Sequence, residues 1–423
     1  MNRKARRGCG IDVHKASLSA CLRLHGKGRK VSEEIRTFGT TGDQLLALHD
    51  WLKEHEVTEV AMEATGVYWK PVYYVLEDGL RVILVNPAEI KRMPGRKTDV
   101  SDCAWLAQLL DNGMLRPSFI PPREIRELRD LVRYRVSLKH DHTRIANRLH
   151  KVLQDADLKL SSVMSDILGV SGRQILSQLA KGNCDPVALA DLARANLRGK
   201  LPQLRQALSG RFNAHHAFLL SRLLADLDNT EEAMAQVAER IEAQLVPFAA
   251  ELQRLCTIPG VKQVAAAAIL AEIGTDMSRW PSEHHFTSWL TLAPNNKVSG
   301  GRLLSSRTTP SANRAAVILR RCAMSLARTP TALGAFYRRL AARAGKPTAI
   351  TATARKLAVL VYRVLSGKLI YNDPGAAAYH ELNRARELKS LRKRAKLMGL
   401  DLIDRATGEI LKPATAAVPS PVS

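Results

Sequence analysis

The pattern of apolar residues changes abruptly near Pro121, and this change constrains the fold more than any other feature. Residues 8–115 alternate between short apolar runs, typical of strands, and stretches with helical spacing. From Pro121 onward the pattern is helical and offers no strand candidates. With 423 residues, the chain is long enough for two or three domains. We therefore expect an N-terminal α/β domain followed by mainly helical ones.

The order of elements in residues 8–115 predicts a mixed sheet. Five strands are expected, in the segments CGIDV, ASLSACLRL, KVSEEIRTF, VTEVAME and LRVILVN. Helices are expected over residues 42–54, over about 67–78, and in the segment GRKTDVSDCAWLAQLLDNGML. Three consecutive strands followed by strand–helix repeats are the layout of the ribonuclease H-like fold, a mixed sheet with helices on its faces.

Two long helices with apolar seams are expected after this region. In the first, apolar residues recur every seven positions, at Leu131, Leu138, Ile145 and Val152. The second covers about residues 231–255 with the same spacing, at Met234, Ile241, Phe248 and Leu255. Pro247 should kink this second helix. Such helices pair as an antiparallel hairpin within one chain or between two chains, and pairing within the chain is the simpler expectation.

The C-terminal part contains a turn and a glycine-rich segment between helices. The turn at Pro259 and Gly260 leads into an alanine-rich helix that ends at Gly274. It resembles a helix-hairpin-helix, which holds a DNA backbone through main-chain amides, although Lys262 stands where a second glycine is usual. An ordinary helix start fits the same residues equally well. Basic helices then run to about Leu369, followed by a basic tail helix and the segment ATAAVPSPVS, which we expect to be disordered.

The charge of the chain favours a polyanionic partner. Sixty-four Lys and Arg against 40 Asp and Glu leave a net charge of +24. Nucleic acid is the simplest partner, while a generic basic surface, a ribosome-associated protein or a binder of anionic membranes has a similar composition. The six cysteines form no CxxC pair, and no signal peptide or membrane-spanning run is evident. We therefore expect a soluble, reduced, cytoplasmic protein.

Four carboxylates follow strands of the predicted sheet. Asp12 and Glu63 each end an apolar strand, and Asp99 and Asp102 lie three residues apart at the start of a helix. In a mixed sheet these side chains can converge, and close carboxylates repel unless a cation such as Mg²⁺ or Mn²⁺ lies between them. Helix capping alone would explain the two aspartates of the helix, but it explains neither Asp12 nor Glu63.

The segment KVSGGRLLSSRT is a second candidate site. Its two glycines allow the backbone to approach a ligand closely. Its cations suit phosphate groups, and they are Lys297, Arg302 and Arg307. A serine here would be a phosphate contact or an activated nucleophile, and three serines compete on equal local grounds: Ser299, Ser305 and Ser306. From the residues alone, a flexible phosphate-binding loop is the better interpretation.

Five motifs occur together, in the order GIDVHK, AMEATGVYW, GRKTDVSDCAWLAQLL, TIPGV and LAPNNKVSGGRLLSSRT. Nearly the whole chain thus resembles the DEDD transposases of bacterial insertion sequences of the one-ten type, whose guide is a bridge RNA. The resemblance implies a RuvC-like N-terminal domain and a mainly helical remainder. The implied domains are a DEDD catalytic domain (1–120), a helical coiled-coil domain (121–254), a C-terminal transposase domain with the serine loop (255–375), and a basic helix with a disordered tail (376–423).

The resemblance also implies roles for individual residues. Asp12, Glu63, Asp99 and Asp102 match the tetrad that holds divalent metal in the family. Ser299, in the SGG motif, matches the serine that attacks a DNA phosphate and becomes covalently linked to it. The family's composite site joins the tetrad of one protomer to the serine of another. This implies a homodimer, which assembles to a tetramer on donor and target DNA with a bridge RNA as guide.

The resulting hypothesis is a nucleoid-associated bacterial DNA transposase that excises and inserts its element by metal-dependent, serine-linked strand exchange. One alternative is a RuvC-like, structure-specific nuclease in which metal-activated water cuts the DNA and the serine loop only binds it. A second alternative is a non-catalytic nucleic-acid-binding protein in which the acids merely cap helices.

Overall fold

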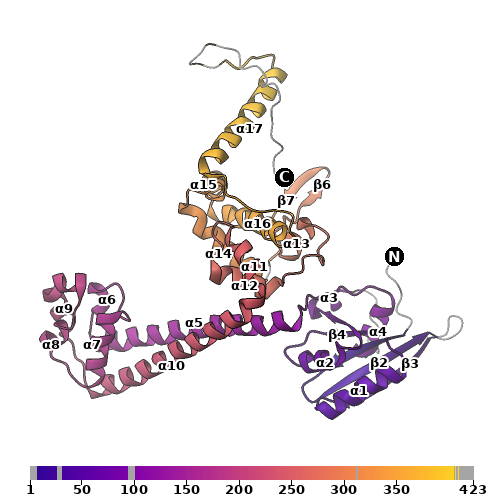
Figure 1. Cartoon of the computed structure of the whole chain (residues 1–423), viewed down its shortest axis with the longest axis horizontal. Coiled ribbons are helices and arrows are strands. Elements are labelled where there is room, and N and C mark those ends of the chain that lie inside the picture. Colours follow the sequence, from indigo (N-terminus) through magenta and orange to yellow (C-terminus); the bar gives the residue numbers. More distant parts are fainter. Residues whose placement is uncertain are drawn as a thin grey trace. The chain divides into compact units, whose positions relative to one another are not determined.

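The computed structural model describes residues 7–25, 31–93, 101–310, 313–403, 405 and 408. The tail segment ATAAVPSPVS, expected to be disordered, lies outside these residues. The chain divides into two compact units, Met1–Pro121 and Pro122–Ser423, and Figure 1 labels most of their helices and strands. Within the described residues, no helix combines the length and the apolar character needed to cross a membrane.

The first unit contains a five-stranded mixed sheet in the order β3-β2-β1-β4-β5. The strands are β1 (Arg7–Val13), β2 (Ser17–His25), β3 (Val31–Gly39), β4 (Glu59–Glu63) and β5 (Arg81–Val85). β1, β2 and β3 form an antiparallel meander, and β4 and β5 run parallel to β1. This topology confirms the ribonuclease H-like layout expected from the order of the sequence signals.

Helices cover both faces of this sheet. They are α1 (Gly42–Glu54), α2 (Trp69–Leu76), α3 (Pro87–Ile90) and α4 (Asp102–Asp111). The apolar sides of α1 and α2 form one core with alternate residues of β1, β2 and β4. α4 packs on the opposite face, where Cys103, Ala104 and Ala107 meet Cys21 of β2. The period-2 alternation of each strand therefore divides its side chains between these two layers.

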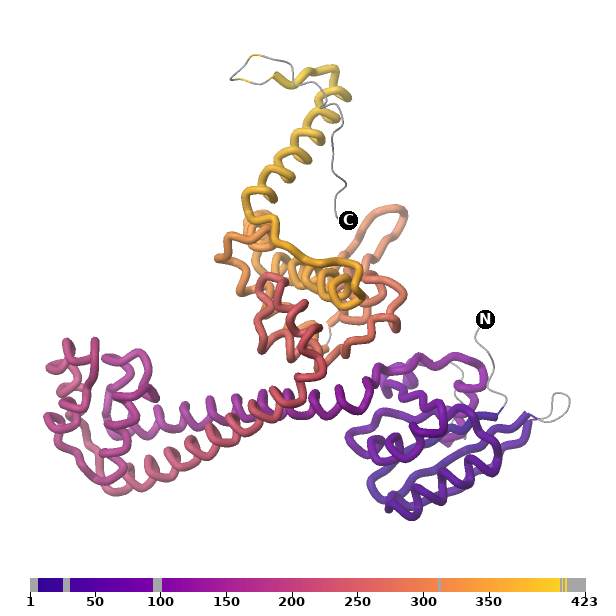
Figure 2. The backbone as a smooth tube through the Cα atoms, in the orientation of Figure 1, coloured from indigo at the N-terminus to yellow at the C-terminus, as the bar shows by residue number. Residues whose placement is uncertain are grey.

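The second unit begins with two long antiparallel helices that pack along each other, α5 (Arg123–Asp155) and α10 (Ala214–Leu245). Figure 2 shows the backbone leaving along α5 and returning along α10. Between them the chain forms a small helical bundle with its own apolar core. Its elements are α6 (Leu160–Val163), α7 (Val170–Ala180), α8 (Pro186–Ala190), η1 (Ala195–Lys200) and α9 (Leu201–Ala207).

The second long helix begins well before residue 231, where the sequence analysis placed its start. Its first turn is fixed by a capping box, in which the Asn213 side chain accepts from the backbone of His216 and the His216 side chain accepts from the backbone of Asn213. Leu220 and Leu227 extend the seven-residue apolar spacing upstream and are fully buried. At Pro247 the helix gives way to a 3₁₀ turn, η2 (Val246–Phe248), which agrees with the expected interruption.

The remainder of the second unit is mainly helical. Its helices are α11 (Ala249–Cys256), α12 (Gln263–Ile273), α13 (Glu283–Trp289), α14 (Arg314–Ser325), η3 (Leu326–Arg328), α15 (Ala332–Ala344), α16 (Lys346–Leu365) and α17 (Gly375–Leu397). The turn at Pro259 and Gly260 joins α11 to α12, and Gly274 ends α12, as the sequence indicates.

The expectation of no strands after Pro121 is wrong. Residues 297–305 form a hairpin of β6 (Lys297–Ser299) and β7 (Arg302–Ser305). Its turn is Gly300-Gly301, and both glycines have positive φ, 54° and 75°. Two successive positive φ angles are the requirement of a type I′ hairpin turn, which favours glycine. Strands of three and four residues are too short for an alternating pattern to stand out in the sequence.

Two arginines of α5 hold the end of α12. Arg129 donates from Nε to the carbonyl of Ala271 and from Nη2 to that of Glu272, both at 2.9 Å. Arg133 donates to both carboxylate oxygens of Glu272, at 2.9 and 2.7 Å. Burial lowers the pKa of Arg129 to about 10, although Glu272 beside it favours the charged form. The last-turn carbonyls of α12 are thus satisfied by charged donors.

We expect Glu272→Ala to lower the free energy of unfolding by about 2–3 kcal/mol, because it leaves the charges of Arg129 and Arg133 without their carboxylate. This is less than a fully buried pair costs, since Arg133 is partly exposed. Urea denaturation followed by far-UV circular dichroism measures the change. Glu127→Ala is the control, because Glu127 pairs with Arg123 on the exposed surface of α5. An equal effect of both substitutions would contradict the structural role of Glu272.

Candidate active site

The end of β1 is the centre of the candidate site. Cys9, Ile11 and Val13 lie in the core with α1 and α2, so the alternate residues Gly10 and Asp12 face α4. A Cβ atom at Gly10 would lie 2.2 Å from the carbonyl oxygen of Cys103 and 2.4 Å from the backbone nitrogen of Ala107. The α4 backbone therefore rests directly on β1. Asp12 follows two residues later on the same face, where the strand ends.

β4 brings Glu63 to the position beside Asp12. Val60 and Met62 belong to the core under α1 and α2, which turns Glu63 to the α4 face. The parallel register pairs Ile11 of β1 with Met62 of β4. The residues that follow them, Asp12 and Glu63, therefore lie side by side. Neighbouring strands are about 4.8 Å apart. Two carboxylates thus extend from adjacent strand ends to the same side of the sheet.

Asp102 is the first residue of α4, and its charge reaches the same region. Burial raises the pKa of Glu63 above its ordinary value, and the negative charges of Asp12 and Asp102 raise it further. A hydrogen bond from Thr65 and the positive charge of Lys91 act in the opposite direction. The charges of Asp12 and Asp102 therefore both act on Glu63. These are three of the four predicted carboxylates, and they share one electrostatic environment.

Two neighbours of these carboxylates have polar contacts with them. His14 places Nε2 3.2 Å from Oδ2 of Asp12, although its side chain is largely exposed. Thr65 donates from its hydroxyl to Oε1 of Glu63 at 3.4 Å. The sequence analysis did not single out Thr65 or Lys91. Their only signal was proximity in sequence to a strand end, which many surface residues share.

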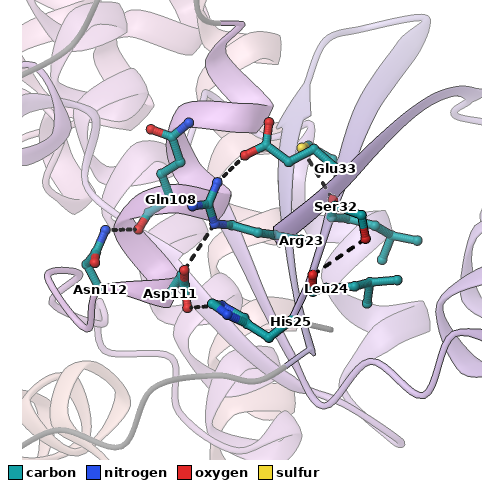
Figure 3. A network of polar contacts seen from close by, with 10 residues as sticks. Arg23, Leu24, His25, Ser32, Glu33, Gln108, Asp111 and Asn112 are labelled. Carbon is teal, nitrogen blue, oxygen red and sulfur yellow. Dashed lines mark hydrogen bonds and ion pairs between the residues drawn. The ribbon is translucent and has the colours of Figure 1, made fainter. Parts of the chain in front are cut away.

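The opposite end of α4 is anchored to β2 by a polar network (Figure 3). Asp111, the last residue of the helix, accepts from Nε of Arg23 at 3.0 Å and lies 2.7 Å from Nε2 of His25. Arg23 also pairs with Glu33 of β3. Because Asp111 is mostly buried, this network fixes where the helix ends. The contact at Gly10 and this anchor together determine where the first turn of α4, with Asp102, meets the sheet.

The donor set suits a hard divalent cation, because it consists of carboxylate oxygens. Asp99, the fourth member expected, lies outside the described residues. Within the part of the chain that the structure describes, no three Asp, Glu, His or Cys side chains already lie close enough together to hold a metal ion. Neighbouring carboxylates repel one another, so an ion bound among them would draw their oxygens together. The residues present therefore fit a divalent metal in chemical type.

The second candidate site is the β6–β7 hairpin. Ser299 is the last residue of β6, directly before the glycine turn, and its Cα partner is Arg302. A Cβ atom on either glycine would meet nothing within 4 Å, so the turn is open to an approaching ligand. The Ser305 hydroxyl accepts from the backbone of Arg307 at 3.3 Å, whereas Ser306 follows the end of β7. The predicted flexible loop is thus an ordered hairpin with Ser299 next to its turn.

The surroundings of the hairpin carry a charge pattern that the sequence analysis missed. Between Glu283 and Asp373 the chain contains no Asp or Glu and fifteen Lys or Arg. Within the described residues of this interval, only Arg363 pairs with an acid, Glu283, at 2.7 Å. A search for long acid-free intervals would have found this signal. Such a region favours the binding of a polyanion.

Comparison with known proteins gives the family. A model described as a transposase of the DEDD IS110 type matches residues 9–156, and a model described as "Transposase IS116/IS110/IS902 family" matches residues 252–338. The chain belongs to the IS110 family of transposases. IS110-family transposases cleave and rejoin DNA, so the chain is an enzyme with DNA as its substrate. A DEDD nuclease domain also implies a divalent metal.

Two individual relatives of this transposase, from Pseudomonas aeruginosa and Streptomyces coelicolor, agree with that assignment. A probable family 20 transposase of Pseudomonas aeruginosa is 26% identical over 258 residues, which are 60% of this chain and 67% of the relative. An uncharacterized 43.6 kDa protein of the insertion element IS110 from Streptomyces coelicolor is 25% identical over 339 residues, 72% of this chain and 80% of the relative. The RuvC structure of Thermus thermophilus matches 26% of this chain and 99% of its own length, with 15% identity and a TM-score of 0.20.

We expect Gly10→Ala to destabilise the transposase by about 1–3 kcal/mol and to displace α4, because the new methyl group would overlap the α4 backbone. DNA cleavage should fall even at temperatures where the variant is folded. Thermal unfolding and a cleavage assay measure the two effects. Gly79→Ala is the matched control, since a Cβ atom there meets only His49, at 3.5 Å. Wild-type cleavage by the Gly10→Ala variant would contradict the importance of this contact.

Proposed function

We propose that the transposase excises and inserts its element by metal-dependent, serine-linked DNA strand exchange. The observation that carries this proposal is the convergence of Asp12, Glu63 and Asp102 on the α4 side of the sheet edge. Capping of α4 explains only one of these acids. The alternative of a non-catalytic binding protein gives no reason for three carboxylates that repel one another, whereas a metal-dependent enzyme does.

The carboxylates in this proposal hold divalent ions, with Mg²⁺ or Mn²⁺ as the chemically suited choice. Asp99 would be the fourth ligand. When bound, the metal supplies charge stabilisation to the oxygens of a phosphodiester under attack. Thr65 orients Glu63 through its hydrogen bond, and His14 contacts the outer side of Asp12. Lys91 contributes positive charge near Glu63.

Ser299 would act as the nucleophile. Its Oγ attacks a DNA phosphorus, so that a bond between phosphorus and the serine oxygen forms while a bond to a deoxyribose oxygen breaks. The serine loses its proton to a base, and the released sugar oxygen takes up a proton. One phosphodiester replaces another, which allows later rejoining without an external energy source. The open turn beside Ser299 and the cations Lys297, Arg302 and Arg307 support this role.

The assembly and the guide are part of the same proposal. We propose a homodimer that forms a tetramer on donor and target DNA. In this assembly the carboxylates of one protomer and Ser299 of another would form one composite active site. A bridge RNA would select the DNA sites. The support is the family membership together with the net charge of +24, which suits two nucleic acids at once. The four domains of this enzyme would be those inferred from the sequence.

We expect the wild-type protein, incubated with Mg²⁺, the element's own RNA and its junction DNA, to form a protein–DNA adduct that survives boiling in denaturant. Ser299→Ala should reduce the adduct by about 10³-fold or more, because it removes the nucleophile. Ser306→Ala is the matched control and should leave the adduct intact. DNA cutting without any adduct would support the water-using nuclease instead, and an adduct in Ser299→Ala would assign the bond to another residue.

We expect Asp12→Asn, Glu63→Gln and Asp102→Asn each to abolish metal-dependent cleavage while DNA binding is retained, because each removes a charged ligand but keeps the shape. Cleavage gels and binding measured by fluorescence anisotropy separate the two effects. Asp78→Asn serves as the control, since Asp78 is an exposed acid beyond α2. If the three variants cleave DNA as well as the wild type does, the carboxylates are not the catalytic centre.

A further inference from the structure

The β6–β7 hairpin exposes three large apolar side chains. Val298, Leu303 and Leu304 are 61%, 58% and 68% exposed, although all lie within five residues of Ser299. A short hairpin gains little stability from apolar side chains that face water, and clustered exposed apolar residues mark a surface that binds another molecule. These residues therefore form a candidate contact surface on the hairpin.

The register of the hairpin gathers these side chains. Val298 and Leu303 are Cα partners, so they lie on the same face of the two strands. The register shifts between Lys297 and Val298, because Lys297 pairs with Ser305 and leaves Leu304 without an opposite residue. A bulge of this kind turns a side chain away from the regular pleat. The apolar side chains of Val298, Leu303 and Leu304 thus form a group beside Ser299 and are not divided evenly between the two faces of the hairpin.

The charge around the hairpin identifies the class of partner. Lys297, Arg302 and Arg307 lie on or next to the strands, within the acid-free interval between Glu283 and Asp373. A protein surface complementary to this region would need both an apolar patch and many acids. DNA offers both features in one molecule, because its phosphates are anionic and its unstacked bases are apolar.

We propose that the hairpin inserts Val298, Leu303 and Leu304 between DNA bases that flank the phosphate attacked by Ser299. The cations of the hairpin hold the phosphates, and the glycine turn lets the backbone come close to them. Separating one base step costs a few kcal/mol, which phosphate contacts offset. The unstacked step would expose the phosphate to the serine. This inference rests on the proposed function in one respect, the choice of Ser299 as the reacting group.

The test uses the full-length protein with its RNA and junction DNA carrying 2-aminopurine next to the exchange point. The fluorescence of this base rises when it loses its stacking partner. All proteins carry Ser299→Ala, so that the DNA stays uncleaved and the signal reports binding alone. We expect a severalfold rise with Ser299→Ala. Adding Leu303→Ser and Leu304→Ser should remove most of that rise at saturating protein, while the protein remains folded because both side chains are exposed.

Phe218→Ser is the matched control, because Phe218 is 64% exposed on α10 and outside the acid-free interval. It should leave the fluorescence rise unchanged. The proposal is wrong if Ser299→Ala gives no rise, or if the Leu303→Ser, Leu304→Ser variant gives a full one. Loss of protein assembly in that variant, measured by light scattering without DNA, would identify a second copy of the chain as the partner instead.

The adduct assay separates this inference from the proposed function. An adduct with the wild type but no fluorescence rise would retain serine chemistry and reject base insertion. A rise that depends on Leu303 and Leu304 without any adduct would retain base insertion and reject Ser299 as the nucleophile.

Discussion

The direct contact between the backbone of α4 and β1 at Gly10 is the constraint on which the candidate site depends. Only a residue without a side chain allows the carbonyl of Cys103 to lie so close to the strand. This contact places the first turn of α4 over the ends of β1 and β4. The buried Asp111, held by Arg23 and His25, fixes the opposite end of the helix. Asp102, the candidate metal ligand at the start of α4, is thus positioned by the packing of Cys103 and Ala107 against Gly10.

The two candidate sites have opposite charge, and this contrast is consistent with the chemistry proposed. The carboxylates around Glu63 repel one another and require cations. The hairpin with Ser299 lies in an interval that has no acid and requires anions. DNA together with a divalent metal satisfies both requirements. Neither site is explained by the stability of the fold, because exposed apolar groups and neighbouring like charges both oppose folding.

Much of the fold could be predicted from the sequence, because strong local patterns determine it. The five strands of the first unit and the helix Gly42–Glu54 follow from alternation and helical spacing, and the family follows from five motifs in order. The early start of α10 was missed, although Leu220 and Leu227 continue its apolar seam upstream with the same seven-residue spacing. The hairpin was missed because its strands have only three and four residues.

The candidate site was predictable in part. Asp12 and Glu63 were recognisable as lone acids at strand ends, and Asp102 by its place in a helix start. Lys91 could not be predicted, because its position near Glu63 depends on a fold that brings separate loops together, and the only signal of Thr65 was its place two residues after Glu63. Asp99 and the role of Ser299 stay predictions. So do the domain boundaries, the bridge RNA and the tetramer, which no local pattern determines.

The central claim is that Asp12, Glu63 and Asp102 bind divalent metal together. Anomalous diffraction from crystals of the protein grown with Mn²⁺ tests it most directly. The account predicts an anomalous peak with oxygens of all three carboxylates about 2.0–2.3 Å away, as hard cations bind oxygen ligands. No peak at the ends of β1 and β4, or a peak bound by only one of these residues, would contradict the account.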